Sequence, residues 1–499
     1  MITINHILKY VISHKKGSFM SKFTKIDTLL QNIGTNDSKM SRRDAMKFMA
    51  ISPVAAAALA GSTVGATSAQ ASDAKGKIVI VGGGAGGIMA MQRLKSSLNN
   101  PDITIIAPNE VHLYQPGQIF MAAGEYTFED IVMDNNDWIG EGVTWIKDEV
   151  EVFDADNNTV TTREGDVINY DYLVVATGLQ YHYDWIDGLT EDMIGTNGIS
   201  SVYLNDLEKG TADGGIITHE WFQAIHEASK TGKPKVVCTQ PNTPIKCGGA
   251  PQKILYLSDD YLRRDGLTAD FTFATNGGKL FSLPTVDASL KEIQKDYGNI
   301  DSKFKHNLIA LDAEAKKATF THTYEVQGAW DKDLEEYDTI TKKETVVLEY
   351  DFIHVVPPMS APDAVVASKL GWQKGTAKGW LEVDKHTLQH RRYKNVFGIG
   401  DICGIPMGKT GGSARHHGPI LTENLIAVME GKEPKAVFDG YTVCPLKTSY
   451  GEIIMAEFNY DGPAPSFPLD ISKPRWIWWP FDLYMLKPMY KYLMMKGLM

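Results

Sequence analysis

Cysteine is the residue type here that most directly offers redox chemistry, because its thiolate is a nucleophile and two thiols can share a disulfide. The chain carries four cysteines, Cys238, Cys247, Cys403 and Cys444. They are too few and too far apart for the disulfide framework of a small secreted domain. No C-x-x-C motif occurs, which disfavours an exchange enzyme of the thioredoxin type. A reactive pair must therefore be assembled by the fold from distant segments.

A glycine-rich turn predicts a dinucleotide site near the start of the globular sequence. Residues 77–81 (KIVIV) form a short apolar run typical of a buried strand, and a helical pattern begins at Ile88. Between them, Gly82 permits a tight turn, Gly84 lets the backbone approach a pyrophosphate, and Gly87 lets the helix pack on the strand. The helix N-terminus then presents its positive end to the phosphates.

The next expected strand, residues 102–106, lacks the acidic residue that usually binds the adenosine ribose at its end. The sequence continues with Ala, Pro, Asn109 and Glu110. We therefore expect Asn109 or Glu110 to make the ribose contact.

Two later strands extend this pattern. Residues 172–178 (YLVVATG) end in Ala-Thr-Gly, and residues 395–401 (NVFGIGD) end in Gly-Asp. The order of these motifs resembles the two-dinucleotide-binding-domain flavoproteins, in which the final Asp contacts the ribityl chain of FAD. The resemblance implies an α/β fold of the pyridine nucleotide-disulfide oxidoreductase type, with two Rossmann-like domains. It also implies that Thr177, Gly178 and Asp401 are FAD contacts.

In that family the second Rossmann-like unit usually binds NAD(P)H. Here its first strand is expected at residues 235–238, and the loop that follows, residues 239–253, contains no G-x-G-x-x-G. Pro241 and Pro244 stiffen this loop and remove amide donors. We therefore expect no NAD(P)H to bind, so that electrons reach FAD from another donor.

The loop that replaces the fingerprint carries Cys247, where a nicotinamide would approach the flavin. Cys403 follows the flavin-binding Asp401 by two residues. Two cysteines facing one flavin predict a redox-active pair, which an exported protein can hold as a disulfide. The alternative is two isolated buried cysteines. We interpret Cys238, inside a strand, and Cys444, in a Val-Cys-Pro segment, as structural.

Longer stretches resemble the sulfide:quinone oxidoreductases, most closely the branch that includes the animal mitochondrial enzyme. The matching stretches are 242–253 (NTPIKCGGAPQK), 352–360 (FIHVVPPMS), 400–410 (GDICGIPMGKT), 439–446 (DGYTVCPL) and 455–458 (MAEF). The resemblance runs from Lys77 to Gly497. It implies that hydrogen sulfide is oxidised and that a membrane quinone accepts the electrons. Residues 198–203 lack the cysteine that tethers FAD in some bacterial members, so FAD is expected to be non-covalent.

By the same analogy, hydrosulfide attacks a Cys247–Cys403 disulfide and leaves a persulfide and a thiolate. The resemblance assigns the thiolate that reacts with FAD to Cys403, and places Lys409 and Thr410 beside the flavin. Lys246, Lys253 and Lys409 are candidates for lowering a thiol pKa and attracting the anion. For each lysine the alternative is a solvated surface position.

Composition and length set the wider frame. The chain has 499 residues and a formal net charge of −11, which argues against nucleic-acid binding. The sequence has no apolar run of ~18 residues, and the pair His416-His417 lacks the further ligands of a metal site. We expect five segments: an extension and signal (1–71), an FAD-binding domain in two parts (72–190 and 351–435), a second Rossmann-like domain (191–350) and a C-terminal segment (436–499).

Residues 41–71 have the features of a twin-arginine export signal. Arg42 and Arg43 precede a short apolar run, and the segment ends in Ala69-Gln70-Ala71. Such signals carry folded proteins, so we expect the periplasmic side of a bacterial cytoplasmic membrane. The alternative is an arginine pair beside a buried alanine-rich helix. Met40 is a candidate start residue.

The C-terminal residues 474–496 are rich in aromatic side chains, and three of the ten Trp lie within residues 476–479. Pro480 and Pro488 divide the segment, so it cannot be one membrane-spanning helix. Aromatic rings and lysines suit the headgroup zone of a bilayer. We expect peripheral docking on the membrane, with quinone entering between this tail and the flavin domain. The alternative is a tail packed on the body or in a dimer interface.

Two other functions remain in view. The flavoprotein subunit of a flavocytochrome c sulfide dehydrogenase also has a cysteine pair, but the GGAPQK sequence after Cys247 and the aromatic tail favour the quinone enzyme. A non-catalytic flavin-binding sensor is disfavoured by the two cysteines. Residues 312–350 are expected to form a solvated β insertion without chemistry, and a homo-oligomer is compatible with the sequence.

Overall fold

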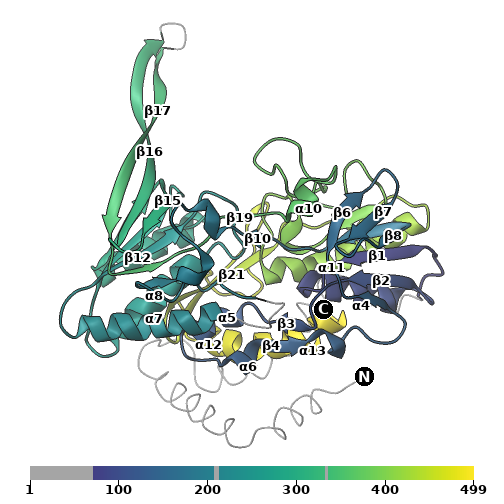
Figure 1. Cartoon of the computed structure of the whole chain (residues 1–499), viewed down its shortest axis with the longest axis horizontal. Coiled ribbons are helices and arrows are strands. Elements are labelled where there is room, and N and C mark those ends of the chain that lie inside the picture. Colours follow the sequence, from purple (N-terminus) through teal and green to yellow (C-terminus); the bar gives the residue numbers. More distant parts are fainter. Residues whose placement is uncertain (1–70, 207–212, 332–334) are drawn as a thin grey trace, which may run out of the picture. The chain divides into compact units, whose positions relative to one another are not determined.

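Short β-branched strands build the first of two parallel sheets. The computed structural model describes residues 71–206, 213–331 and 335–499, so the predicted export signal, apart from Ala71, lies outside the described residues. The first sheet has the order β20-β9-β1-β2-β5. Its strands are β1 (Lys77–Val81), β2 (Asp102–Ile106), β5 (Thr144–Ile146), β9 (Tyr172–Val175) and β20 (Val396–Gly398). Helix α4 (Ala85–Ser97) follows β1 and packs against α11 (Gly411–Met429) (Figure 1).

A second sheet of five parallel strands has the order β11-β18-β12-β13-β14. Its strands are β11 (Ile199–Ser200), β12 (Lys235–Gln240), β13 (Asp270–Thr275), β14 (Ile300–Phe304) and β18 (Phe352–His354). The associated helices are α7 (Asp213–Ser229), α8 (Ala250–Arg263) and α9 (Pro284–Tyr297). The two sheets confirm the predicted α/β fold with two Rossmann-like units. The strand at 352–354 belongs to the second sheet, just beyond the boundary proposed at residue 350.

The segment expected to be a β insertion is an antiparallel sheet of β15 (His306–Asp312), β16 (Lys317–Asp331) and β17 (Glu336–Glu349). The hairpin of β16 and β17, green in Figure 1, continues well past the end of β15. Most residues of β17 are exposed, which agrees with the predicted solvated position.

The remaining strands form smaller antiparallel sheets. One three-stranded sheet consists of β6 (Val150–Asp154), β7 (Thr159–Thr162) and β8 (Val167–Asn169). Another consists of β21 (Thr442–Ser449), β22 (Glu452–Asn459) and β23 (Gly462–Pro463). There are also two-stranded sheets, formed by β3 (Val111–Leu113) with β4 (Val132–Asp134) and by β10 (Gln180–Tyr181) with β19 (Met359–Ser360). Short helices are α5 (Gly117–Ala122), α6 (Phe128–Ile131) and α10 (Asp363–Val366).

The C-terminal segment comprises α12 (Trp478–Pro480), a π-helical turn (Phe481–Leu486) and α13 (Lys487–Tyr492). Trp478 and Trp479 are buried, and the Trp479 ring lies edge-on to Phe120, 5.5 Å between centroids. The Tyr126 hydroxyl donates to the backbone oxygen of Leu483. The tail therefore packs on the body, as in the alternative weighed above. No helix among the described residues is long and apolar enough to cross a membrane.

Candidate active site

The glycine turn after β1 has the geometry that a dinucleotide requires. A Cβ added to Gly87 would lie 1.8 Å from the backbone oxygen of Gly82, so strand and helix touch here without side chains. A Cβ on Gly84, the N-cap of α4, would meet no atom within 4 Å. The helix N-terminus thus faces open space that a methyl group would enter, which fits a bound pyrophosphate.

The ends of β9 and β20 supply the other predicted flavin contacts. The Thr177 hydroxyl is buried and has no hydrogen-bond partner among the described residues. Gly178 has a positive φ of 70° and nothing near its Cβ position. Burial raises the pKa of Asp401, which directly follows Gly400 at the end of β20. An orphaned hydroxyl beside an open glycine fits a ligand with polar atoms, and these residues fit FAD.

The two candidates for the ribose contact differ in their surroundings. The exposed carboxylate of Glu110 pairs with Lys147. Asn109 follows the carboxyl end of β2, and its backbone oxygen accepts a hydrogen bond from the Asn135 side chain at 2.9 Å. The Asn109 side chain has no hydrogen bond to another described residue, and Asn109 remains the predicted ribose contact.

Cys247 lies immediately before α8, in a strained turn. Its φ is 48°, in the left-handed region that non-glycine residues adopt at a cost of about 1 kcal/mol or more. Its N–H donates to the backbone oxygen of Lys409 at 2.8 Å, and its carbonyl accepts from Ala250 N–H at 2.7 Å. The Cys247 side chain is half-buried. A position before a helix N-terminus favours a thiolate.

The neighbour of Cys247 is Cys444, on β21. The Cys444 thiol donates a hydrogen bond to the Cys247 sulfur. Gly249 makes this approach possible, because a Cβ there would lie 2.6 Å from the Cys444 sulfur and 2.4 Å from Leu446. The structure therefore brings together one predicted redox cysteine and one that we had interpreted as structural.

Cys403, the predicted partner of Cys247, is buried at a different place. Its side chain lies in the hydrophobic cluster of the first sheet, with Leu381 and Val383, and its sulfur is 3.1 Å from the Cβ position of Gly398. Burial raises the pKa of the Cys403 thiol to about 12. The pairing of Cys247 with Cys403 remains a prediction, and the contact of Cys247 with Cys444 offers an alternative pair.

Comparisons with known proteins identify the family. A model of the pyridine nucleotide-disulphide oxidoreductase family matches residues 76–209. The mitochondrial sulfide:quinone oxidoreductase of Dictyostelium discoideum is 38% identical over 426 residues, covering 84% of this chain and 86% of that protein. The mitochondrial enzyme of Mus musculus is 34% identical over 425 residues, with the same coverage. The chain belongs to the sulfide:quinone oxidoreductase family.

The solved structure of the sulfide:quinone oxidoreductase from Aquifex aeolicus matches with a TM-score of 0.63. The match has 21% identity and covers 85% of this chain and 92% of that chain. At this identity the match supports the fold that the two family members share.

The charges around Cys247 are dominated by lysines. The Lys253 Nζ donates to the Cys247 sulfur at 3.2 Å. The hydrogen bond from Cys444, together with Lys253 and Lys447, lowers the pKa of the Cys247 thiol well below its usual value. Burial acts to lower the pKa of Lys253, but its interactions with the two sulfurs prevail and raise it. Both shifts favour a thiolate at Cys247 beside a protonated Lys253.

Lys246 and Lys409 are placed less directly. The Lys246 Nζ donates to Gln115 at 2.6 Å and lies 5.0 Å from the centre of the Tyr181 ring. The Lys409 Nζ donates to the backbone oxygens of Asp401, at 2.5 Å, and Cys403, at 3.2 Å. Neither lysine is a solvated surface residue. Burial lowers the pKa of Lys409 to about 8.

Thr410 and the histidine pair have structural partners. The Thr410 hydroxyl caps α11 by accepting from Ser413 N–H at 3.2 Å. His416 stacks on Tyr441, and the His417 Nδ1 accepts from Gly400 N–H at 3.1 Å. The described residues contain no group of three or more metal-ligating side chains, and whether Thr410 touches FAD remains a prediction.

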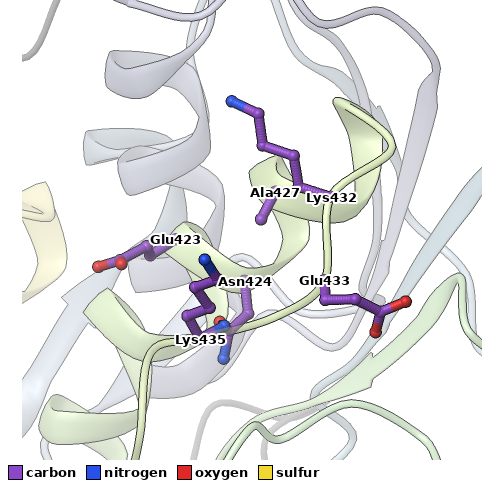
Figure 2. Close-up of a pocket in the computed structure, with 6 residues that line it drawn as sticks. All are labelled: Glu423, Asn424, Ala427, Lys432, Glu433 and Lys435. Atoms are coloured by element: carbon purple, nitrogen blue, oxygen red, sulfur yellow. The ribbon is translucent and has the colours of Figure 1, made fainter.

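A surface cavity lies elsewhere, at the far end of α11 (Figure 2). It has a volume of 440 Å³ and is lined by Glu423, Asn424, Ala427, Lys432, Glu433 and Lys435. Its helical residues lie three turns or more beyond Thr410, about 20 Å along the axis. The Asn424 amide is already bonded to four backbone groups. We assign this cavity no part in the cysteine site.

Sequence reasoning missed three residues of the site: Cys444, Lys447 and Asp482. Cys444 lies in the DGYTVCPL stretch that resembles the family, so that resemblance was an available signal. Lys447 and Asp482 form an ion pair that only the folded chain reveals.

Proposed function

We propose that this chain oxidises hydrogen sulfide at the Cys247–Cys444 pair and passes two electrons through FAD to a membrane quinone. The observation that carries the proposal is the contact of these two cysteines beside Lys253, in a chain with an FAD-type glycine turn. The names of the curated relatives support sulfide as donor and quinone as acceptor.

In the resting enzyme the two cysteines form a disulfide. Hydrosulfide attacks the Cys444 sulfur, the S–S bond breaks, Cys444 becomes a persulfide and Cys247 leaves as the thiolate. The assignment follows from the lowered pKa of Cys247, because the thiol of lower pKa is the better leaving group. Lys253 holds the departing negative charge at 3.2 Å.

The sulfane sulfur then passes from Cys444 to a nucleophilic acceptor, which leaves a second thiolate. The two thiolates re-form the disulfide as they give up two electrons. When bound, FAD accepts these two electrons and delivers them to the quinone. The strained turn at Cys247 keeps its sulfur close to Cys444 throughout, so the pair can close again without a large movement.

The deciding experiment is anaerobic titration of purified enzyme with sulfide, followed by decylquinone. Cys247→Ser and Cys444→Ser should retain FAD but lose sulfide-dependent bleaching of the flavin. Cys403→Ala, the matched control, should bleach and be reoxidised by decylquinone as the wild type is. Normal bleaching in Cys444→Ser, with loss in Cys403→Ala, would restore the original pairing. Reoxidation by cytochrome c instead of decylquinone would favour a flavocytochrome-type partner.

We also propose that FAD is bound non-covalently and that NAD(P)H is not a donor. The loop between β12 and α8 carries Cys247 and two prolines in place of a glycine fingerprint. Acid precipitation should release all of the FAD, and NADH should leave the flavin oxidised under anaerobic conditions. Flavin bleaching by NADH would disprove the second point.

For location, we propose twin-arginine export and peripheral docking on the periplasmic side of the membrane. The export proposal rests on the sequence of residues 41–71, whereas three curated relatives carry mitochondrial names. Docking rests on the half-exposed apolar residues of the tail, among them Met485 and Leu486. Replacing both Arg42 and Arg43 by lysine should leave the precursor in the cytoplasm; unchanged export would rule out this route.

A further inference from the structure

A buried ion pair joins the C-terminal segment to the strand that carries Cys444. The Lys447 Nζ lies 2.6 Å from Asp482 Oδ2, and each side chain is only 3% exposed. Lys447 is three residues from Cys444 on β21, and Asp482 lies in the π-helical turn of the tail. Lys447 also lies 4.3 Å from the centre of the Phe120 ring, against which Trp479 packs.

Such a pair is not explained by stability alone. Removing two charges from water is costly, and well-packed hydrophobic residues often replace a buried ion pair without loss. The surroundings here, Phe120 and Trp479, are already apolar. The pair is therefore better explained by what its charges act upon, and both lysines of this region interact electrostatically with the Cys247 sulfur.

A small group of titratable side chains surrounds Cys247. Groups that face Cys247 or its lysines come from four places: Lys253 on α8, Cys444 and Lys447 on β21, Asp482 on the tail, and the buried Tyr203 hydroxyl after β11. Beyond these groups, Asp401 interacts electrostatically with Cys247 and also with Lys409 and Lys246, which offset its charge. With a neutral disulfide, Lys253 and Lys447 contribute two positive charges and Asp482 one negative charge. One hydrosulfide or one thiolate then brings the set to neutrality.

We propose that Asp482 is a positioning residue of the sulfide site: it holds the Lys447 ammonium group in place near the cysteine pair, so that the buried set carries one net positive charge and accommodates one anion at a time. The inference rests on the proposed function, because the anion is the hydrosulfide that enters and the thiolate that replaces it. It gives the C-terminal segment a part in the cysteine chemistry as well as in packing.

The test is the pH dependence of alkylation at Cys247 in the reduced, full-length holoenzyme. Iodoacetamide labels the protein at a series of pH values, and mass spectrometry quantifies the Cys247 peptide. Lys447→Met removes the cation and leaves the Asp482 carboxylate, so the apparent thiol pKa should rise by about one unit or more. In Lys447→Met/Asp482→Asn the carboxylate is also gone, so the pKa should fall back toward the wild-type value. The difference between the two variants measures the effect of Asp482.

Lys487→Met is the matched control. Lys487 also anchors the tail, through Asp130 at 3.0 Å, but it lies outside the set of charges around Cys247. It should lower thermal stability without moving the thiol pKa. An unchanged pKa in Lys447→Met, equal pKa values in the single and double variants, or an equal shift in Lys487→Met would each overturn the proposal. Because alkylation needs neither sulfide nor quinone, a failure of the proposed function shows separately, as a wild-type enzyme that sulfide does not bleach.

Discussion

The ammonium group of Lys253 lies 3.2 Å from the sulfur of Cys247, six residues earlier in the chain. Lys253 belongs to the first turn of α8 and is almost fully buried, so its charge is poorly screened by water. This contact therefore places a positive charge from α8 beside the sulfur in the loop that precedes the helix.

Replacing Lys253 by methionine should slow sulfide-dependent bleaching of the flavin about tenfold or more at pH 7. The cation that lowers the Cys247 pKa is lost, so the departing thiolate is less stable. The deficit should shrink as pH rises, and Lys253→Arg should restore part of the rate. Stopped-flow absorbance at several pH values measures both effects; a rate equal to the wild type would contradict the assigned role.

Gly84 and Gly87 should respond differently to an added methyl group. In Gly84→Ala the methyl enters open space where the pyrophosphate is expected, so the protein should fold with FAD bound about tenfold more weakly. In Gly87→Ala the methyl meets the backbone of Gly82, so folding itself should fail. Flavin content and thermal melting of the two variants test this contrast. Full FAD binding by Gly84→Ala would place the cofactor elsewhere.

His354 should make stability depend on acid pH. Burial lowers its pKa to about 3, whereas a histidine in an unfolded chain titrates near 6.5. Between these values the unfolded chain binds a proton that the folded chain does not. The free energy of unfolding should therefore fall as pH falls, by about 1.4 kcal/mol per pH unit from this residue.

His354→Gln tests this pH dependence. Glutamine can still accept the Val202 N–H that the His354 Nε2 accepts at 3.0 Å. Urea unfolding at pH 6, 5 and 4 should show a shallower loss of stability in the variant. Equal slopes in the two proteins would remove His354 from the acid response.

Membrane docking by the tail should be sensitive to charge on its half-exposed residues. Met485→Glu/Leu486→Glu should reduce cosedimentation with phosphatidylglycerol–phosphatidylethanolamine vesicles while leaving thermal stability near that of the wild type. Ile340→Glu, on the exposed hairpin, is the matched control and should bind as before. Undiminished binding by the tail variant would refute the docking surface. Deleting the whole tail is a poorer test, because it also removes Asp482 from the cysteine site.

The sequence predicted best what depends on local pattern. The glycine turn, the strands that precede Thr177 and Asp401, and the solvated insertion all follow from strand periodicity and turn chemistry. The contact of Cys247 with Cys444 could not be predicted in this way. It depends on the tertiary packing of β21 against α8, which requires that Gly249 has no side chain. The burial of Cys403 among hydrophobic side chains was not predictable either, because nearness in sequence to Asp401 does not fix where a side chain points.

The tail shows the same limit in another form. An aromatic, lysine-containing segment suits a bilayer surface and a protein surface equally well by composition. Trp478 and Trp479 are buried against other residues of this chain. The Asp482 that follows them is the residue whose burial distinguishes a packed segment from a purely lipid-facing one.

The adjacency of Cys247 and Cys444 has a mechanical consequence. Cys247 and Cys444 are 197 residues apart in sequence. A disulfide between them closes a loop that contains most of the second sheet and the flavin-binding strand β20. Closing a loop of this length restricts the unfolded chain by about 5 kcal/mol. In the proposed cycle each hydrosulfide breaks this disulfide, and the disulfide forms again when the turnover is completed. With the disulfide open, the enzyme is thus less stable to unfolding than with it closed. Heat and proteases should inactivate it fastest when sulfide is plentiful and quinone is scarce.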